Sequence, residues 1–444
     1  MAKKSKSTQG SGHVTGAIGR ASKLLQLASS MAKAEISHRV FKGDGAEAAA
    51  DTAKMRLQQA TAIVRELGHL KGAAMKLGQM LALEARDFLP DEVVAVLEQL
   101  HNNASFMPFE TMFAVVQADL GAKASKLQSL SREPVAAASI GQVHSAQVNG
   151  AAVAIKVQYP GIRDSIHADV RILSVVLKSM SKLFRREFEI DGLLKEFSEV
   201  FIQETDYVQE ALAQAEYKSF AAKLNGIRVP KVYSELSSAR VLTMDFENGL
   251  PITKWMRDIN PSLEARRRIG ESILDLYTRE FCDWGLVQTD PNPGNFLVDP
   301  KTDELVLLDF GATKRYSLEF RKHYSQLVMA IYNKDHKAVR EIAVSLGLIS
   351  QRENESAFAV FEALVFESMR PLTMPVFDFR DQDYVKTVKA LTRQLVKELK
   401  YSPPPKNLIF LHRKLGGVFQ ILKLLAVELN LEIYISRFKS MAES

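Results

Sequence analysis

The segment Gln288–Asn295 constrains this 444-residue chain more than any other, because its two prolines and one glycine exclude a helix or a regular strand. It reads Gln-Thr-Asp-Pro-Asn-Pro-Gly-Asn, so Asp290 and Asn295 lie five residues apart in a rigid loop. A carboxylate and an amide at this spacing match the D-x-x-x-x-N pattern, in which the Asp faces the substrate and the Asn binds a metal ion. We therefore predict a catalytic loop here rather than a turn-rich connector.

A second element follows Asn295 by fourteen residues: the apolar run that ends in Asp309-Phe310-Gly311. A hairpin of two short strands, at 295–298 and 305–308, fits into the intervening length. Mg²⁺ prefers carboxylate and amide oxygens, which Asp309 and Asn295 supply. We predict that these two residues are the metal ligands.

Lys156 stands in Val153-Ala154-Ile155-Lys156, inside a β-type run, where its apolar neighbours imply a buried surrounding. A buried lysine needs an anionic partner. Glu204, on a long helix expected over 193–224, is the predicted partner. In this pairing the strand lysine holds the α- and β-phosphates of a nucleotide, and the helix glutamate orients it.

The four elements occur in the order found in protein kinases: the strand lysine, the helix glutamate, the Asp/Asn loop and Asp-Phe-Gly. We predict an α+β, atypical protein-kinase-like bilobal fold with a helical N-terminal extension and extra inserted helices. Strands are expected at 142–148, 152–158 and 241–246. Helices are expected at 109–120, 162–183 and 193–224, and mainly helices follow Pro251. The predicted divisions are a basic tail (1–45), the helical extension (46–130), an N-lobe (131–250), a C-lobe (251–400) and a C-terminal helical region (401–444).

Two features contradict an ordinary protein kinase. The glycine-rich loop is replaced by an alanine-rich segment, in which only its third glycine remains, as Gly141. Alanine removes easy access to positive φ, so the backbone should approach phosphates differently and nucleotide preference or turnover should change. The predicted nucleotide contacts of this segment are Ala136, Ala137, Ala138, Ser139 and Gly141.

The second feature is the missing activation segment, since a helical pattern begins near Ser317, soon after Gly311. Protein kinases hold an extended peptide there. Its absence favours a small-molecule phosphotransferase or an ATPase over a protein kinase. Further nucleotide contacts are expected where the strand 241–244 enters the hinge: Met244 near the gatekeeper position and Asp245, whose backbone faces adenine.

Composition restricts the remaining possibilities. The chain is 46% hydrophobic and 25% charged, as in ordinary globular proteins, and its single cysteine, Cys282, excludes a disulfide scaffold. Residues 1–43 hold eight Lys/Arg against one acid, so the tail carries +7 and the remaining chain −1. This distribution argues against nucleic acid as a partner. We expect no transmembrane helix and a cytoplasmic protein, peripheral at the inner face of a membrane. The amphipathic pattern from Ala17 to Ile36 fits either an anionic membrane surface or the protein's own core.

Taken together, these motifs resemble the UbiB/AarF family of atypical kinase-like proteins, which support ubiquinone biosynthesis. The resemblance covers about residues 50–400. Its further motifs are Lys76-Leu77-Gly78-Gln79 (K-x-G-Q), Glu204-Thr205-Asp206 (E-x-D) and Glu210.

The resemblance implies a kinase-like fold that binds ATP with Mg²⁺, with the K-x-G-Q helix packed over the would-be substrate site. It implies that Lys76 contacts Glu210, that Gln79 belongs to the same motif, and that Lys156 pairs with Glu204. It also implies ATPase activity or phosphorylation of a small-molecule or lipid-related substrate at a membrane, next to quinone-biosynthesis proteins. If Lys76 lies in a groove that Asp290 and Asp309 also line, its charge would neutralise these carboxylates or the transferred phosphate. Without the resemblance, 71–84 is equally an ordinary docking helix.

Two other hypotheses remain open. A pseudokinase-type scaffold would use nucleotide only as a conformational ligand, although the intact Lys156, Asp290 and Asp309 favour turnover. A small-molecule phosphotransferase outside quinone metabolism would share the short activation segment but would not predict Lys76–Gln79 or the alanine-rich segment.

Overall fold

The computed structural model describes residues 106–138, 140–167, 190–399 and 406–444, together with Val170, Arg171, Ser174 and Lys178. The basic tail, most of the expected helical extension with Lys76 and Gln79, and Ser139 lie outside these residues. The chain divides into two compact units. The first holds Met1–Met112, Ala137–Gln142 and Gln158–Thr205, and the second holds Phe113–Ala136, Val143–Val157 and Asp206–Ser444. The domain divisions expected from the sequence stay a prediction.

In the first unit, buried glutamine side chains hold the backbone. Gln142 exchanges two hydrogen bonds with Met107: its Oε1 accepts from the Met107 amide at 2.9 Å, and its Nε2 donates to the Met107 carbonyl at 3.3 Å. Gln158 Nε2 donates to the carbonyl of Thr205 at 2.8 Å, just after helix α7 (Ile190–Glu204). Gln142 and Gln158 are fully buried or nearly so, which makes these bonds costly to lose.

The expected strands are present in a four-stranded sheet of order β1-β2-β3-β5. Its members are β1 (Ala136–Ala138), β2 (Gly141–Val148), β3 (Ala151–Gln158) and β5 (Val241–Asp245). Asn149 and Gly150 join β2 to β3 with φ of 51° and 81°, as a two-residue turn with two positive φ angles requires. In β3, the side chains of Val153, Ile155 and Val157 are fully buried, so Lys156 lies in an apolar strand as predicted.

The single long helix expected over 193–224 is two helices. Helix α7 ends at Glu204, and α8 (Tyr207–Ala221) starts after a break at Thr205 and Asp206. The carboxylate of Asp206 accepts hydrogen bonds from the amides of Val208 and Gln209, which makes Asp206 the N-cap of α8. An Asp that can cap a new helix therefore competes with continuation of the first one.

Two short strand pairs hold the loops that carry the catalytic motifs. Strands β8 (Phe296–Val298) and β9 (Leu305–Leu307) form the predicted hairpin within the sheet β4-β9-β8-β6. Its other strands are β4 (Ile227–Arg228) and β6 (Leu250–Pro251). Strand β7 (Leu286–Gln288) pairs with β10 (Thr313–Arg315), so that Gln288 lies opposite Thr313. The loops 289–295 and 308–312 are therefore anchored at both ends by paired strands.

The remainder of the second unit is mainly helical, as predicted after Pro251. Helix α11 begins at Leu318, where the hydroxyl of the N-cap Ser317 accepts from the amide of Phe320. With α11 (Leu318–Tyr332), the α-helices that follow Pro251 are α9 (Ile252–Lys254), α10 (Leu263–Arg279), α12 (His336–Ser345), α13 (Glu355–Met369), α14 (Gln382–Glu398), α15 (Lys406–Leu425) and α16 (Glu432–Glu443). Two short strands, β11 (Phe377–Asp378) and β12 (Glu428–Leu429), pair with each other. Helix α5 (Phe109–Leu120) is shared by both units.

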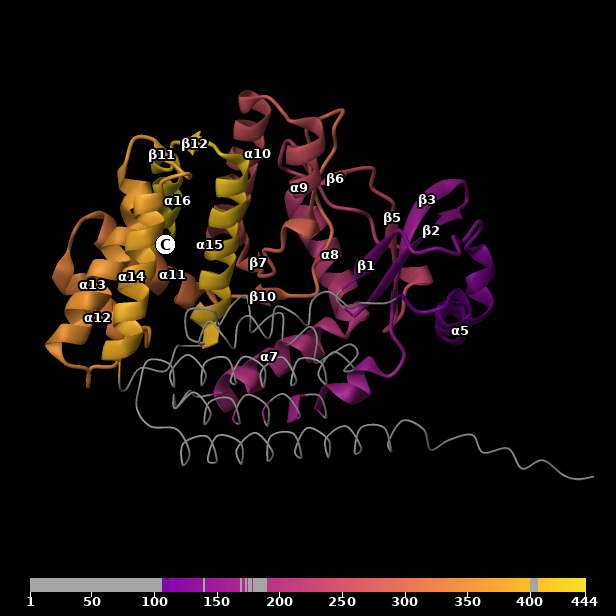
Figure 1. The fold of residues 1–444 in the computed structure, drawn as a ribbon, viewed down its shortest axis with the longest axis horizontal. Helices are drawn as coiled ribbons and strands as arrows, with labels where there is room; N and C mark the ends of the chain where they lie inside the picture. Colours follow the sequence, from indigo (N-terminus) through magenta and orange to yellow (C-terminus); the bar gives the residue numbers. More distant parts are fainter. Residues whose placement is uncertain are drawn as a thin grey trace, which may run out of the picture. The chain divides into compact units, whose positions relative to one another are not determined.

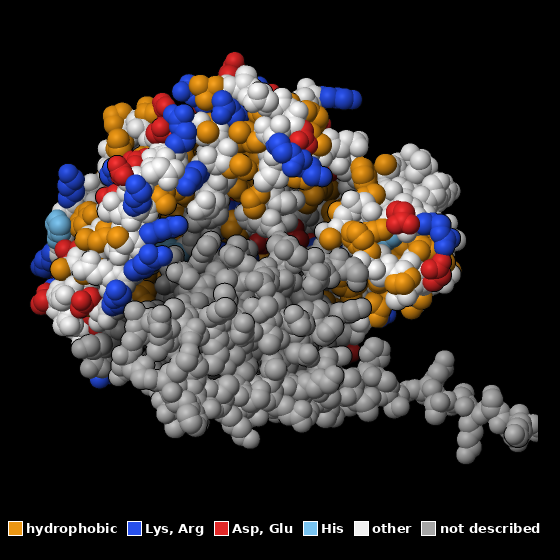
Figure 2. All heavy atoms as spheres, in the orientation of Figure 1, with side chains coloured by type: hydrophobic (Ala, Val, Ile, Leu, Met, Phe, Trp, Pro, Cys, Tyr) orange, Lys and Arg blue, Asp and Glu red, His pale blue; other side chains and the backbone are white. Residues whose placement is uncertain are grey.

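Helices α10 and α15 lie side by side in the second unit (Figure 1), and both contribute to its largest core cluster. The adjacent group α11–α14 shows Lys and Arg side chains interspersed with acidic ones on its surface (Figure 2). Among the described helices, none combines the length and the apolar character that crossing a bilayer requires.

Candidate active site

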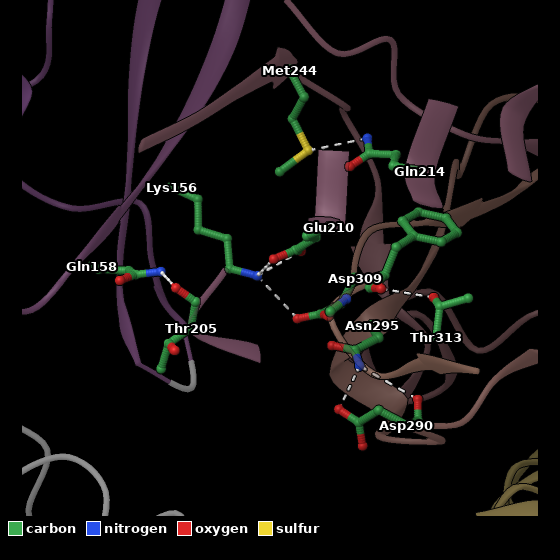
Figure 3. A network of polar contacts seen from close by, with 12 residues as sticks. Lys156, Gln158, Thr205, Glu210, Gln214, Met244, Asp290, Asn295, Asp309 and Thr313 are labelled. Atoms are coloured by element: carbon green, nitrogen blue, oxygen red, sulfur yellow. Dashed lines mark hydrogen bonds and ion pairs between the residues drawn. The ribbon is translucent and has the colours of Figure 1, made fainter. Parts of the chain in front are cut away.

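Lys156 is the centre of a buried ion cluster in the second unit. Its Nζ lies 2.8 and 3.1 Å from the two carboxylate oxygens of Glu210 and 3.2 Å from Oδ2 of Asp309 (Figure 3). Burial by itself lowers the pKa of the ammonium, but the charges of Asp309 and Glu210 outweigh this effect and raise it well above its usual value. Lys156 is thus a permanent cation between two carboxylates. We call Lys156, Glu210 and Asp309 the Lys156 cluster.

The prediction that Lys156 pairs with Glu204 is wrong, because its carboxylate partners are Glu210 and Asp309. Glu204 ends α7 and belongs to the first unit, whereas Glu210 lies in the first turn of α8, beyond the break at Thr205 and Asp206. The sequence prediction placed Glu204 and Glu210 on one continuous helix, whereas the structure places them on two. The contact of Lys76 with Glu210 lies outside the described residues and stays a prediction.

Helix α8 presents a polar face to the site. Glu210, Gln214 and Tyr217 are all buried and follow one another at i, i+4 and i+7, so they share one side of the helix. Gln214 Nε2 donates to the carbonyl of Pro230 at 3.0 Å and lies 3.5 Å from Sδ of Met244, the predicted gatekeeper (Figure 3). The sequence of α8 contains a signal for this polar face, since Glu210, Gln214 and Tyr217 recur at helical spacing among alanines.

The catalytic loop orients its own asparagine. Asn295 Nδ2 donates to Oδ2 of Asp290 at 2.9 Å, which directs Oδ1 of Asn295 away from that carboxylate. The side chain of Asn292 accepts from the amide of Gly294 at 3.0 Å and stabilises the intervening turn. Asn295 Oδ1 is a ligand of the kind that Mg²⁺ prefers.

The Asp-Phe-Gly segment is fixed at each of its first two residues. Asp309 Oδ1 accepts from the amide of Gly311 at 3.0 Å, while Oδ2 accepts from Lys156. Phe310 is buried, and its ring lies 4.8 Å from that of Tyr217 on α8. The carboxylate of Asp309 remains partly accessible, at 21% exposure of its side chain, so it can exchange partners while its backbone stays in place.

A second buried cluster lies behind the catalytic loop, and sequence analysis missed it. Lys414 Nζ, on α15, lies 3.2 Å from Oε2 of Glu280 and donates to Oε1 of Gln288 at 3.1 Å. Tyr217 Oη donates to the other oxygen of Glu280. Burial raises the pKa of Glu280, although the charge of Lys414 opposes this shift. We call Lys414, Glu280, Gln288 and Tyr217 the Lys414 cluster.

Gln288 links this cluster to both catalytic segments. Its Nε2 donates to the backbone carbonyl of Asp290 at 2.7 Å and to that of Asp309 at 3.2 Å. Lys414 donates to the amide oxygen of Gln288 and so fixes the orientation of this side chain. The amide nitrogen of Gln288 can therefore hold both loops at once. The glutamine stands where ordinary kinases carry His.

Helix α15 supplies one more contact that the sequence did not predict. Arg413 Nη2 lies 3.0 Å from Oδ1 of Asp290, and both side chains are about 10% exposed. Arginine and aspartate are 123 positions apart, so no local pattern relates them. Both oxygens of the Asp290 carboxylate thus accept hydrogen bonds, one from Asn295 and one from Arg413.

The structure places the remaining predicted nucleotide contacts in strands. Ala136–Ala138 form β1 and Gly141 opens β2, so the alanine-rich segment is a strand pair rather than an open loop. Asp245 donates its amide to the carbonyl of Lys231, and its carboxylate accepts from the amide of Lys231 and the hydroxyl of Tyr233. Its backbone amide is therefore engaged within the protein, and the adenine contact of Asp245 stays a prediction.

Comparison with known proteins agrees with this geometry. Residues 99–343 match the family model of the ABC1 atypical kinase-like domain. The chain is 34% identical over 394 residues to the atypical kinase COQ8B, mitochondrial, of Danio rerio, covering 87% of this chain and 62% of that protein. It is 32% identical over 401 residues to the probable serine/threonine-protein kinase abkA of Dictyostelium discoideum, covering 85% and 70%.

A solved structure agrees as well. The Rv3197 protein of Mycobacterium tuberculosis, determined in complex with erythromycin, superposes with a TM-score of 0.59 at 25% identity and covers 86% of this chain and 96% of that one. The α+β kinase-like fold is therefore confirmed. The chain is a member of the ABC1 atypical kinase-like family, the UbiB/AarF and COQ8 group that its motifs resemble.

Proposed function

We propose that this protein binds ATP with Mg²⁺ and either hydrolyses it or transfers its terminal phosphoryl group to a small or lipid-related acceptor. The observation that carries the proposal is the Lys156 cluster. The Lys156 ammonium lies within 3.2 Å of the partly accessible carboxylate of Asp309, and Asn295 is nearby (Figure 3). An ammonium suits a polyphosphate, and carboxylate and amide oxygens are the ligands that Mg²⁺ prefers.

Each residue of the site then has a defined role. Lys156 contacts the α- and β-phosphates and Glu210 orients it. Asn295 and Asp309 would hold Mg²⁺, which would supply positive charge to neutralise the phosphates. Asp290 faces the acceptor, either a hydroxyl or a water molecule, and orients it for attack. Met244, Asp245 and the segment of Ala136, Ala137, Ala138, Ser139 and Gly141 are the proposed adenosine and phosphate contacts.

The short connection after Asp-Phe-Gly supports a small acceptor or water. Only six residues separate Gly311 from the first residue of α11, Leu318, and three of them form β10. This segment offers little backbone for an extended peptide. Because the Dictyostelium relative is named a serine/threonine-protein kinase, the assay must nevertheless include a protein acceptor.

Pathway and location are part of the same proposal. Relatives of this chain are named mitochondrial COQ8 kinases, and membership of their family supports a role in isoprenoid-quinone biosynthesis at a membrane surface. Lys76 and Gln79 are proposed to regulate access to the acceptor side, and the basic tail is proposed to contact anionic lipid. Metabolite profiling of a deletion strain for accumulated prenylated quinone precursors tests the pathway.

The activity itself is tested by MgATP binding and by phosphate release, alone and with a protein acceptor. We expect Asp309→Asn to lower turnover by about 100- to 1,000-fold, the usual cost of removing a preorganised electrostatic contact. Asp383→Asn, an exposed aspartate on α14, is the matched control and should leave turnover unchanged. Equal turnover by Asp309→Asn and the parent protein would reject the proposal, and tight ATP binding without turnover would favour the scaffold hypothesis.

A further inference from the structure

Helix α15 contacts the catalytic loop at three residues within little more than one helical turn. Arg413 binds the side chain of Asp290, Lys414 donates to Gln288, and Gly417 packs against Pro291. A Cβ atom on Gly417 would lie 1.9 Å from Cβ of Pro291, so only glycine allows this approach. The helix thus lies against the catalytic loop along residues 288–291.

The contact of Arg413 is the one that reaches a catalytic group. It is a charge-assisted hydrogen bond of 3.0 Å between two side chains that are both largely buried. With Asn295 on Oδ2 and Arg413 on Oδ1, the plane of the Asp290 carboxylate is fixed at both oxygens. Neither donor alone would prevent rotation about the Cβ–Cγ bond.

The loop itself contains no cation that could do this. In the H-R-D form of this motif an arginine precedes the aspartate, whereas this chain has Thr289 there. Thr289 donates its hydroxyl to the carbonyl of Ala312 at 2.6 Å, so it fastens the loop to the segment after Asp-Phe-Gly. The guanidinium beside Asp290 comes instead from a helix 123 positions later in the chain.

We infer that Arg413 is a positioning residue for Asp290, and that α15 thereby sets the rate of phosphoryl transfer from outside the catalytic loop. This inference rests on the proposed function. Arg413 holds the carboxylate in the orientation that the acceptor requires. Arg413 contacts Asp290, whereas the residues proposed to hold the nucleotide are Lys156, Asn295 and Asp309. Loss of Arg413 should therefore change turnover rather than nucleotide affinity.

The test measures kcat and the KM for MgATP in Arg413→Met and Arg413→Lys. A misoriented catalytic group costs up to about 100-fold, so we expect kcat of Arg413→Met to fall about 10- to 100-fold with an unchanged KM. Arg413→Lys should recover part of the loss, because lysine restores the charge without the planar geometry. Arg393→Met, on the exposed side of α14, is the matched control for loss of an arginine and should behave like the parent protein.

A double-mutant cycle separates positioning from structural support. If Arg413 acts through Asp290, then Arg413→Met should lower kcat in the parent protein but have no further effect in Asp290→Asn. Equal losses in both backgrounds would overturn the inference, as would a rise in KM without a change in kcat. Absence of turnover in the parent protein would reject the proposed function as well, whereas normal kcat in Arg413→Met would reject only the role of Arg413.

Discussion

Two buried lysines in this protein have similar surroundings but different numbers of carboxylate partners. Lys156 shares two carboxylates, Glu210 and Asp309, and its cluster is formally −1. Lys414 has one carboxylate, Glu280, with a neutral amide and a phenol, and its cluster is formally zero. Glu280 and Lys414 are at most 2% exposed, whereas 21% of the Asp309 side chain is exposed.

The difference shows how a ligand-binding charge cluster is distinguished from a supporting one. A neutral cluster that is closed to solvent is suited to holding the fold. A cluster with an accessible carboxylate, such as Asp309, can accept a cation. The Lys414 cluster should therefore govern stability, and the Lys156 cluster should govern activity.

The largest expected effect on stability belongs to Lys414→Met. Removing one member of a buried ion pair leaves Glu280 uncompensated, which costs about 3–5 kcal/mol in the free energy of unfolding. Urea denaturation measures this loss, and Lys389→Met on the surface of α14 serves as the control. Adding Glu280→Gln should restore part of the stability. No recovery in the double variant would mean that Lys414 acts through packing rather than charge.

The same variant has a pH dependence of defined sign. Burial raises the pKa of Glu280 above its unfolded value, so its favourable contribution is complete below about pH 4.5 and is lost as pH rises through the folded pKa. Without Lys414 this shift increases. The stability deficit of Lys414→Met should therefore be smaller at pH 5 than at pH 8. A deficit that is equal at both pH values would contradict the charge balance described for this cluster.

A smaller loss is expected for Gly417→Ala, where the added Cβ overlaps Pro291. Overpacking of this kind costs about 1–3 kcal/mol. Gly416→Ala is a closely matched control in the same helix, because a Cβ there meets no atom within 4 Å. Alanine in place of a helical glycine should stabilise by about 0.5–1 kcal/mol. If both variants gained stability, the close approach of α15 to the catalytic loop would be refuted.

The difference between the Lys156 cluster and the Lys414 cluster predicts little change in stability for Asp309→Asn. Lys156 keeps Glu210, so the cluster becomes neutral and balanced, and the free energy of unfolding should stay within about 1 kcal/mol of the parent value. Thermal or urea unfolding without nucleotide measures it, with Asp383→Asn as the control. A loss as large as that of Lys414→Met would erase the distinction between the two clusters.

The final prediction concerns Cys282, the single cysteine of the chain, two positions after Glu280. It is 2% exposed, and burial raises the pKa of its thiol to about 12. The reactive thiolate is then almost absent near pH 8, so the folded protein should resist alkylation until it unfolds. Mass spectrometry after iodoacetamide treatment measures this. Rapid labelling of the folded parent protein would show that the region around the Lys414 cluster is open.

Much of the fold could be predicted from local signals. The alternation around Lys156, the prolines of the catalytic loop and the N-cap Ser317 each act on their own neighbours in sequence, and the structure confirms the elements they indicate. The helix break at Asp206 was missed because a capping aspartate and a solvated helical aspartate look alike. The predicted partner of Lys156 was Glu204, whereas the structure shows Glu210, six residues later and beyond that break.

The contacts of α15 could not be predicted for a different reason. Arg413 and Lys414 are ordinary residues of an amphipathic helix, and nothing in their neighbourhood indicates Asp290 or Gln288. Their role depends on tertiary packing, including a glycine whose importance lies in the proline that it faces. Gly416 and Gly417 are adjacent and identical in sequence terms, yet only the second is sterically constrained.

The position of Arg413 and Lys414 has a consequence for synthesis of the chain. They follow Asp290 by more than 120 residues, so a nascent chain contains every proposed nucleotide ligand well before the catalytic loop has its support. At about 5–20 residues per second, the delay is about 6 to 25 seconds. A ribosome-bound chain therefore cannot complete the proposed site until α15 has emerged, and proteins truncated before α15 should carry the motifs without the geometry.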